Sequence, residues 1–294
     1  MLYDARADWS FLLPHRGTKL LALILVGSAI ATATLLFQTI TQNRILTPSI
    51  MGFDALYILL LTSIVFFLGS QTYFAFGPVA QFTVTLVVLT GSSLLLFGGI
   101  LGRSAGNLIE MVLTGVILAT LFRGLTSFMA RLIDPNDYLV LQSVSFAQFN
   151  RIDTDLLFIA AVLSIITMAR AWQIRHRLDV LALGRVPSIN LGEDPKHGQL
   201  EVLALISVLV SVSTALVGPI AFLGLLVVNA TYLLLPVLQH AVLLPGAALV
   251  ASIVLVSGQF AMERVFAFST PLLTVIDFLG GLVFLWLILR GVMR

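Results

Sequence analysis

Few side chains in this sequence could do chemistry, and they lie far apart along the chain. The histidines are four in number: His15, His176, His197 and His240. There is no cysteine, so thiolate ligands, a cysteine nucleophile and disulfides are all excluded. A transition-metal site needs several His, Cys or carboxylate ligands that converge, and these spacings offer no such set. We therefore expect no metal site and no catalytic residues.

The two lysines exclude a second kind of chemistry. Lys19 lies in "GTKL" and Lys196 in "DPKH". A P-loop needs the pattern G-x-x-x-x-G-K-[ST] to cradle phosphate groups, and neither lysine fits it. The chain is not expected to bind or hydrolyse ATP, so any ATP and Mg would be used by a separate subunit.

Three acidic residues lie in or near long apolar runs: Asp54, Glu110 and Asp277. A charge at membrane depth costs roughly 2.5–3.5 kcal/mol or more, so such residues are functional candidates. The first two are near the ends of their runs, whereas Asp277 is inside the last one. A packed, hydrogen-bonded aspartate is the simpler interpretation of Asp277. The three show no spacing typical of a proton relay.

The composition predicts the solvent in which these residues must be positioned. Of 294 residues, 59% are hydrophobic and only 10% are charged. Soluble domains are closer to half apolar and a quarter charged, so the bilayer must bury much of this chain. The apolar runs are continuous rather than alternating, which excludes a β-barrel. We expect an all-α polytopic membrane protein that forms a single transmembrane domain over residues 1–294.

Nine apolar runs are long enough to be candidate transmembrane helices, since about 20 residues cross the hydrocarbon. They cover residues 20–41, 54–69, 78–101, 107–133, 155–173, 199–217, 221–236, 241–261 and 271–290. The segment 134–154 between them is polar enough to lie at an interface. Because nine is odd, the two ends of the chain should lie on opposite sides.

The distribution of arginine and lysine favours one orientation. With the C-terminus inside, the inner loops would carry Arg44, Arg103, Arg170, Arg175, Arg177, Arg185, Lys196, Arg290 and Arg294. The outer side would carry Arg6, Arg16, Lys19, Arg123, Arg131, Arg151 and Arg264. The bias is small, and it places the C-terminus and Leu178–Asp194 in the cytoplasm. No lysine-rich run indicates a nucleic-acid partner.

The stretch "LDVLALGRVPSINLGED", Leu178–Asp194, looks folded although it is polar. Leu178, Leu181 and Ala182 share one helical face at i, i+3, i+4 spacing. Gly184 can end that helix in a left-handed conformation, and Pro187 suits the start of another helix. The pattern favours two short helices that dock a partner. A cytoplasmic loop lying on the membrane surface is the alternative.

The same stretch, L-x-x-L-A-L-G followed by L-G, resembles the cytoplasmic loop of FecCD-type permeases. Four further blocks match that family in order: "LVGSAIATATLLFQTITQNRILTPSIMG" (25–52), "VGPIAFLGLLVVNATYLL" (217–234), "HAVLLPGAALVASIVL" (240–255) and "STPLLTVIDFLGGLVFLWLILR" (269–290). The family patterns are "LVGAALALAGAxxQxxxxNPLADPxxLG", "xGPIGFVGLxxPHxxR", "HxxLLPxSALxGAxLL" and "xxPVGxxTxxxGxPxFxxLLxR". The stretch "ILTPSIMGFDALY" resembles the vibrio-type subgroup for catechol siderophores.

The sequence also departs from the family pattern. Members typically have ten spans, and the match begins at the second. We expect the first helix to be absent here, or the true start to lie upstream. The family's "NPLADP" reads "NRILTP" from Asn43, and its "PHxxR" reads "VNATY" from Val228. Arg185 stands where members commonly have an acidic residue.

The resemblance implies the permease subunit of an ABC importer in the bacterial inner membrane, carrying a ferric siderophore. Its partners would be a second permease, homologous or identical, two ATP-binding subunits, and a periplasmic or surface substrate-binding protein. A coupling-helix pair at about 176–195 would fit a cleft of the ATPase. The residues expected to make that contact are Leu181, Leu183, Gly184, Arg185, Leu191, Gly192 and Glu193.

The resemblance also implies two further sets of site residues. Basic residues on the outer side dock the binding protein, and here Arg16, Arg264 and His15 are the candidates. The pathway would follow the dimer interface along 108–122 and 271–289. Its candidate lining residues are Thr114, Leu118 and Asp277.

Two other function classes were weighed against the importer. A secondary transporter of a small organic solute or metal chelate would also be polytopic, with polar groups at the midplane and broken helices. It predicts uptake that follows an ion gradient without any ATPase. A membrane-embedded enzyme would need a convergent His, Asp or Glu cluster, and the sequence offers none.

Overall fold

The computed structural model describes residues 9–99, 108–145, 149, 152–264, 275–278, 280–282 and 285, and the elements within these ranges are helical. The helices of the first half are α1 (Trp9–Thr41), the 3₁₀ turn η1 (Pro48–Met51), α2 (Phe53–Ala75), α3 (Pro78–Ser93), the π-turn η2 (Leu94–Gly98), α5 (Leu108–Ala130) and α6 (Pro135–Ser145). The second half has α7 (Thr154–Gln173), α8 (Arg175–Leu181), α9 (Arg185–Asn190), α10 (Pro195–Val217), α11 (Leu223–Leu234) and α12 (His240–Arg264). The all-α prediction is confirmed.

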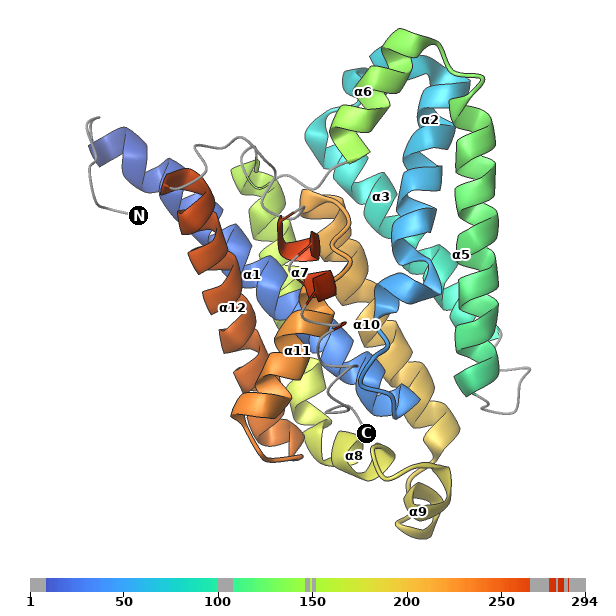
Figure 1. Ribbon diagram of the computed structural model, residues 1–294, viewed down its shortest axis with the longest axis vertical. Helices are drawn as coiled ribbons and strands as arrows, with labels where there is room; N and C mark the ends of the chain where they lie inside the picture. Colours follow the sequence, from blue (N-terminus) through green and yellow to red (C-terminus); the bar gives the residue numbers. More distant parts are fainter. Residues whose placement is uncertain are drawn as a thin grey trace.

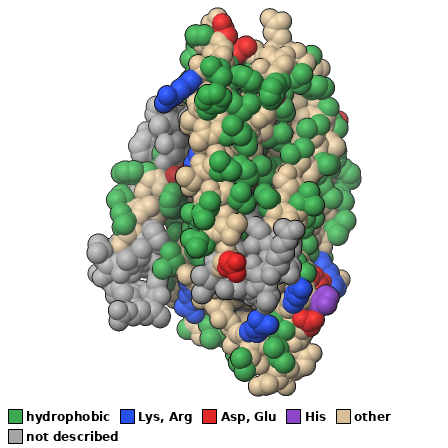
Figure 2. Space-filling model, turned by 90° about the vertical axis from the view of Figure 1, so that its right-hand side faces the viewer, with side chains coloured by type: hydrophobic (Ala, Val, Ile, Leu, Met, Phe, Trp, Pro, Cys, Tyr) green, Lys and Arg blue, Asp and Glu red, His purple; other side chains and the backbone are tan. Residues whose placement is uncertain are grey.

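Seven of these helices are long and apolar enough to cross a membrane. They correspond to seven of the nine expected spans: α1, α2, α3, α5, α7, α10 and α12. The ninth expected span, 271–290, lies mostly outside the described residues. In Figure 2 hydrophobic side chains cover the middle of one face, and charged side chains gather toward its lower end. This distribution fits a bilayer around the middle of the molecule.

The expected span at 221–236 forms a helix, but α11 has only 12 residues. At 1.5 Å per residue such a helix is about 18 Å long, against about 30 Å of hydrocarbon. Gly218 precedes it with a φ of 99° and ends α10. Val217 and Ile220 on either side are buried, so the break in the helix lies inside protein. Irregular backbone is tolerated at membrane depth under that condition.

The helices form two packing groups (Figure 1). In the first, α1 is surrounded by α7, α10, α11 and α12, and their apolar side chains form one continuous core. In the second, α2, α3, α5 and α6 stand beside one another around Tyr57, Leu61 and Leu89. The short helix α6 falls in the segment expected to lie at an interface. Helix α10 also packs against α3 and joins the groups.

Small residues let α1 approach its neighbours closely, as in many membrane helix pairs. A Cβ placed on Gly27 would lie 2.9 Å from Leu255 Cδ1 of α12. A Cβ placed on Gly224 of α11 would lie 2.1 Å from Thr34 Oγ1 and 3.0 Å from Thr34 Cβ. The α1–α11 contact therefore has no space for even one added methyl group.

We predict that Gly224→Ala destabilises the folded protein by about 1–3 kcal/mol, because the added methyl group overpacks a buried helix contact. The measurement is the thermal midpoint of the detergent-purified protein. Gly91→Ala in α3 is the matched control, since a Cβ there meets nothing within 4 Å. Equal midpoints for the two variants would contradict the tight α1–α11 contact.

Candidate docking site for a partner protein

Helices α8 and α9 form a compact element at one end of the molecule, which we call the coupling element (Figure 1). The sequence prediction of two short helices with a break is confirmed. The first helix ends at Leu181, and Gly184 lies in the break directly before α9 with a φ of 97° and a ψ of 174°, a conformation that favours glycine. Gly192 follows the second with a φ of 83°. Pro187 lies inside the first turn of α9, where its missing N–H costs no helical hydrogen bond.

Buried contacts fix the base of the coupling element. Leu178 and Leu181 are both buried against the core, and a Cβ on Gly198 of α10 would lie 3.0 Å from Leu181 Cδ1. Ser188 Oγ lies 2.9 Å from the carbonyl oxygen of Val180 and 2.6 Å from that of Gly184. These hydrogen bonds tie α9 back onto α8. The element is therefore a folded unit rather than a loose loop.

An ionic cluster joins this element to α7 and α10. Arg177 Nη2 lies 2.6 Å from Glu193 Oε1, and Arg177 Nη1 lies 2.7 Å from Glu201 Oε2. Arg170 also pairs with Glu201. The hydrogen bonds to Glu193, and then those to Glu201, raise the pKa of Arg177 above its ordinary value. Glu193, predicted as a docking residue, thus already has an internal partner.

The solvent-exposed surface of the coupling element is largely apolar. Four residues are more than half exposed: Leu183 (58%), Val186 (69%), Ile189 (53%) and Leu191 (62%). Leu183 and Leu191 were predicted at this surface, whereas Val186 and Ile189 were not. Leu181, also predicted, is 6% exposed and supports the element from beneath. Exposed apolar patches rimmed by polar residues are typical of protein interaction sites.

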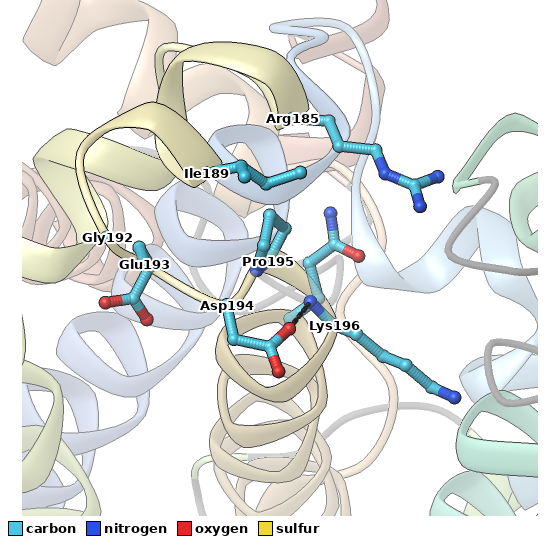
Figure 3. Close-up of a pocket in the computed structure, with 8 residues that line it drawn as sticks. Arg185, Ile189, Gly192, Glu193, Asp194, Pro195 and Lys196 are labelled. Atoms are coloured by element: carbon cyan, nitrogen blue, oxygen red, sulfur yellow. Dashed lines mark hydrogen bonds between the residues drawn. The ribbon is translucent and has the colours of Figure 1, made fainter.

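Beside this patch, a cleft of about 490 Å³ lies between α9 and the start of α10. It is lined by Arg185, Ile189, Gly192, Glu193, Asp194, Pro195, Lys196 and Gln199. In Figure 3 the Arg185 and Lys196 side chains extend toward the same side, while Glu193 points away from them. The Oε1 atom of Gln199 is buried and has no hydrogen-bond partner among the residues that the structure describes. The cleft is thus lined by basic, acidic and apolar side chains.

Asp194 closes one edge of the cleft and caps α10. Its Oδ1 accepts hydrogen bonds from the backbone N–H groups of Lys196 and His197. The His197 side chain, hydrogen-bonded to Asp194, lowers the pKa of this carboxyl below its usual range. Asp194 therefore stays ionised near neutral pH, which suits a residue at a helix N-terminus.

At the opposite end of the molecule the structure brings the predicted basic residues together only in part. Arg16 is half-buried near the start of α1, and Arg264 ends α12, which lies alongside α1 (Figure 1). The side chains of His15 and Arg264 lie outside the described residues. Nearby, Lys19 Nζ lies 2.8 Å from Glu263 Oε1, which also accepts from Gln259.

The predicted pathway residues lie on two elements. Thr114 and Leu118 are half-buried on α5, and Thr114 Oγ1 donates to the Glu110 carbonyl oxygen. Asp277 Oδ1 accepts from the backbone N–H of Phe222 at 3.2 Å, just before α11 begins. This bond agrees with the interpretation of Asp277 as a packed, hydrogen-bonded aspartate. Most of 271–289 falls outside the described residues.

No metal-binding chemistry emerges within the described ranges, where no three His, Asp or Glu side chains are close enough to hold an ion. Asp54 lies in the first turn of α2.

Comparison with known proteins agrees with this geometry. The family model described as the FecCD transport family matches residues 2–290. The chain is 43% identical to the petrobactin import system permease protein YclO of Bacillus subtilis, over 99% of this chain and 92% of that protein. It is 32% identical to the petrobactin import system permease protein FatC of Bacillus anthracis, over 94% of this chain and 78% of that protein.

The fold also matches a solved structure. A metal-chelate type ABC transporter in an inward-facing conformation superposes with a TM-score of 0.84 at 21% identity, covering 97% of this chain and 92% of that one. At this level of identity the likeness shows the fold. Together with the family match, it makes the chain a multi-pass transport permease rather than an enzyme, and the chain belongs to the FecCD transport family.

Proposed function

We propose that the chain is the permease subunit of an ABC importer that moves a ferric siderophore, of the catechol type, across the bacterial inner membrane. The coupling element is the observation that supports this proposal most directly. Its exposed surface is apolar, and hydrogen bonds and ion pairs hold the element in place. A folded, exposed apolar surface at the polar end of a membrane protein needs a partner to cover it. The α8–α9 end and the C-terminus are cytoplasmic in this proposal.

The partner at the coupling element is an ATPase subunit, which uses ATP and Mg that this chain does not bind. Leu183, Val186, Ile189 and Leu191 fill an apolar cleft of that subunit. Arg185 and Lys196 then give the contact its orientation, because charges at an interface rim set specificity more than affinity. Two such ATPases serve a dimer of this permease with an identical or homologous second permease.

On the outer side, Arg16, Arg264 and His15 dock a substrate-binding protein. The ferric chelate then passes along the permease dimer interface, near Thr114, Leu118 and Asp277. Two relatives that match this chain over most of its length are named as petrobactin import permeases, which supports a catechol-type siderophore as the substrate. The iron travels with its own chelator, so the permease needs no metal ligands of its own.

Reconstitution tests this function directly. We predict that proteoliposomes holding the permease with its ATPase take up ferric petrobactin delivered by the binding protein only when ATP is hydrolysed. The measurement is uptake of radioactive iron with ATP or with a non-hydrolysable analogue. Ionophores that collapse ion gradients should leave the rate unchanged. Uptake that follows an ion gradient without the ATPase would instead show a secondary transporter.

The docking surface can be tested separately by co-purification. We predict that Leu191→Asp and Val186→Asp each weaken binding of the ATPase about 30-fold or more, since burying an unpaired carboxylate at an interface centre costs 2 kcal/mol or more. The control is Leu238→Asp, which alters an equally exposed leucine between α11 and α12. Undiminished ATPase recovery with both docking variants would overturn the assigned surface.

Two glycines allow the conformation of the coupling element to be tested. A Cβ on Gly184 would lie 2.8 Å from Gln42 Nε2, whereas a Cβ on Gly192 meets nothing within 4 Å. Both have positive φ, so Ala should strain each by about 1–3 kcal/mol, and Gly184→Ala adds the clash. Trypsin should cleave the coupling element faster in Gly184→Ala than in Gly192→Ala, and faster in both than in the wild type. Adding Gln42→Ala to Gly184→Ala should relieve only the clash. Equal cleavage in the wild type, the two single glycine variants and this double variant would contradict the described backbone.

A further inference from the structure

A chain of hydrogen bonds, centred on a buried histidine, links α8 of the coupling element to α12 and α1. His240, the first residue of α12, lies with its Nδ1 2.6 Å from Asp179 Oδ1 of α8. Its backbone N–H donates to the same oxygen at 2.8 Å. On the other side of the ring, Nε2 lies 2.7 Å from Thr39 Oγ1 of α1. The His240 side chain is 3% exposed and Asp179 is 31% exposed.

The polarity of this chain follows from what each group can donate. An ionised carboxylate only accepts, so the proton between Asp179 and His240 belongs to Nδ1. Thr39 Oγ1 also lies 2.8 Å from the carbonyl oxygen of Leu35, one turn earlier in α1. Nε2 then has to accept, and the single Thr39 proton serves either Nε2 or the Leu35 carbonyl oxygen at any moment. The Thr39 hydroxyl is buried between the ring and its own helix. Because Thr39 and His240 are both buried, this Thr–His–Asp arrangement is structural and Thr39 is not a nucleophile.

The position of Asp179 connects this chain to the docking surface. Asp179 lies in α8, whose buried residues Leu178 and Leu181 support the exposed residues beyond Gly184. A second contact runs in parallel, because the Gln42 amide just after α1 packs over Gly184. The coupling element thus bonds α12 directly through Asp179, reaches α1 through His240 and Thr39, and contacts Gln42 just after α1 at Gly184.

Helices α1 and α12 form a pair that is joined along its length (Figure 1). Beside the coupling element, His240 and Thr39 connect them. In the middle, Gly27 packs against Ala251 and Leu255. At the far end, Lys19 pairs with Glu263. Contacts at both ends and in the middle leave the two helices little freedom to slide past one another.

We propose that Asp179, His240 and Thr39 are positioning residues that lock α8 to the α1–α12 pair, so that the pair moves when the ATPase displaces the coupling element. The lock carries that displacement from the ATPase side toward the Arg16 and Arg264 end. This inference rests on the proposed function. A coupling element without the lock still holds the ATPase through its apolar surface, but it passes less of its displacement to the pair.

The test uses the complete importer in proteoliposomes and measures iron uptake per ATP hydrolysed. Asp179→Ala removes the acceptor, and Thr39→Val removes only the hydroxyl. We expect ATPase recovery on purification to be unchanged, while uptake per ATP falls about tenfold with Asp179→Ala and about threefold or more with Thr39→Val, as expected of coupling free energies of this class. Asp179→Asn should restore most of the ratio, because its amide oxygen still accepts both hydrogen bonds.

Thr41→Val is the matched control, since Thr41 Oγ1 also lies on α1 but donates only within it, to the Phe37 carbonyl oxygen. It should leave uptake per ATP at the wild-type value. If Asp179→Ala does not fold, Thr39→Val against Thr41→Val decides the question. A normal ratio in Thr39→Val, or the same loss in both threonine variants, overturns the lock. Absence of ATP-driven uptake by the wild type would instead overturn the proposed function.

Discussion

The enclosure of α1 by other helices is the constraint on which the rest of the structure depends. In the span Arg16–Thr41, 78% of the 18-residue apolar stretch is buried inside the protein, against 17% for the corresponding stretch of α5. Lipid supplies no hydrophobic drive between helices, so such an enclosure needs close backbone approach, and small residues provide it. Gly27 of α1 allows α12 to pack closely against it, and Gly224 of α11 allows close contact with Thr34 of α1. The coupling element and the second packing group are attached to the helices that this packing holds around α1.

The spans were predictable from the sequence because hydropathy and length decide them, and seven expected helices are present. Helix α11 was not, since an apolar run that contains a helix break has the same composition as one without it. "VGP" indicated a boundary, yet the sequence does not reveal that the following helix stops at Leu234. Burial of the irregular backbone at Val217 and Ile220 makes the short helix tolerable, and burial depends on helices distant in sequence.

The candidate site was predictable where the information is local. Two short helices and a positive φ at Gly184 follow from periodicity and glycine chemistry. Long-range pairs were not predictable. His240 looked like an isolated histidine, because Thr39, its partner, is 201 positions away. Two departures from the family pattern likewise looked independent, but the Arg44 guanidinium lies 4.4 Å from the centre of the Tyr232 ring. A cation in the first block thus faces an aromatic ring in the second, an arrangement with its own attraction.

The two packing groups differ in how they meet the coupling element. Helix α8 packs against α1, α7, α10 and α12, all in the first group. In the part of the chain that the structure describes, α2 packs mainly against α3, α5 and α6, with smaller contacts to η1 and α10. A displacement of α8 would therefore reach the second group through helices of the first group that touch it, chiefly α10 and α7 against α3, or through the segment that joins α1 to η1. The amides of Gln38 and Asn229 hold that segment by the Arg44 carbonyl oxygen. Because packed helices resist deformation, we expect the relative movement to concentrate at the contacts between the groups rather than within either group.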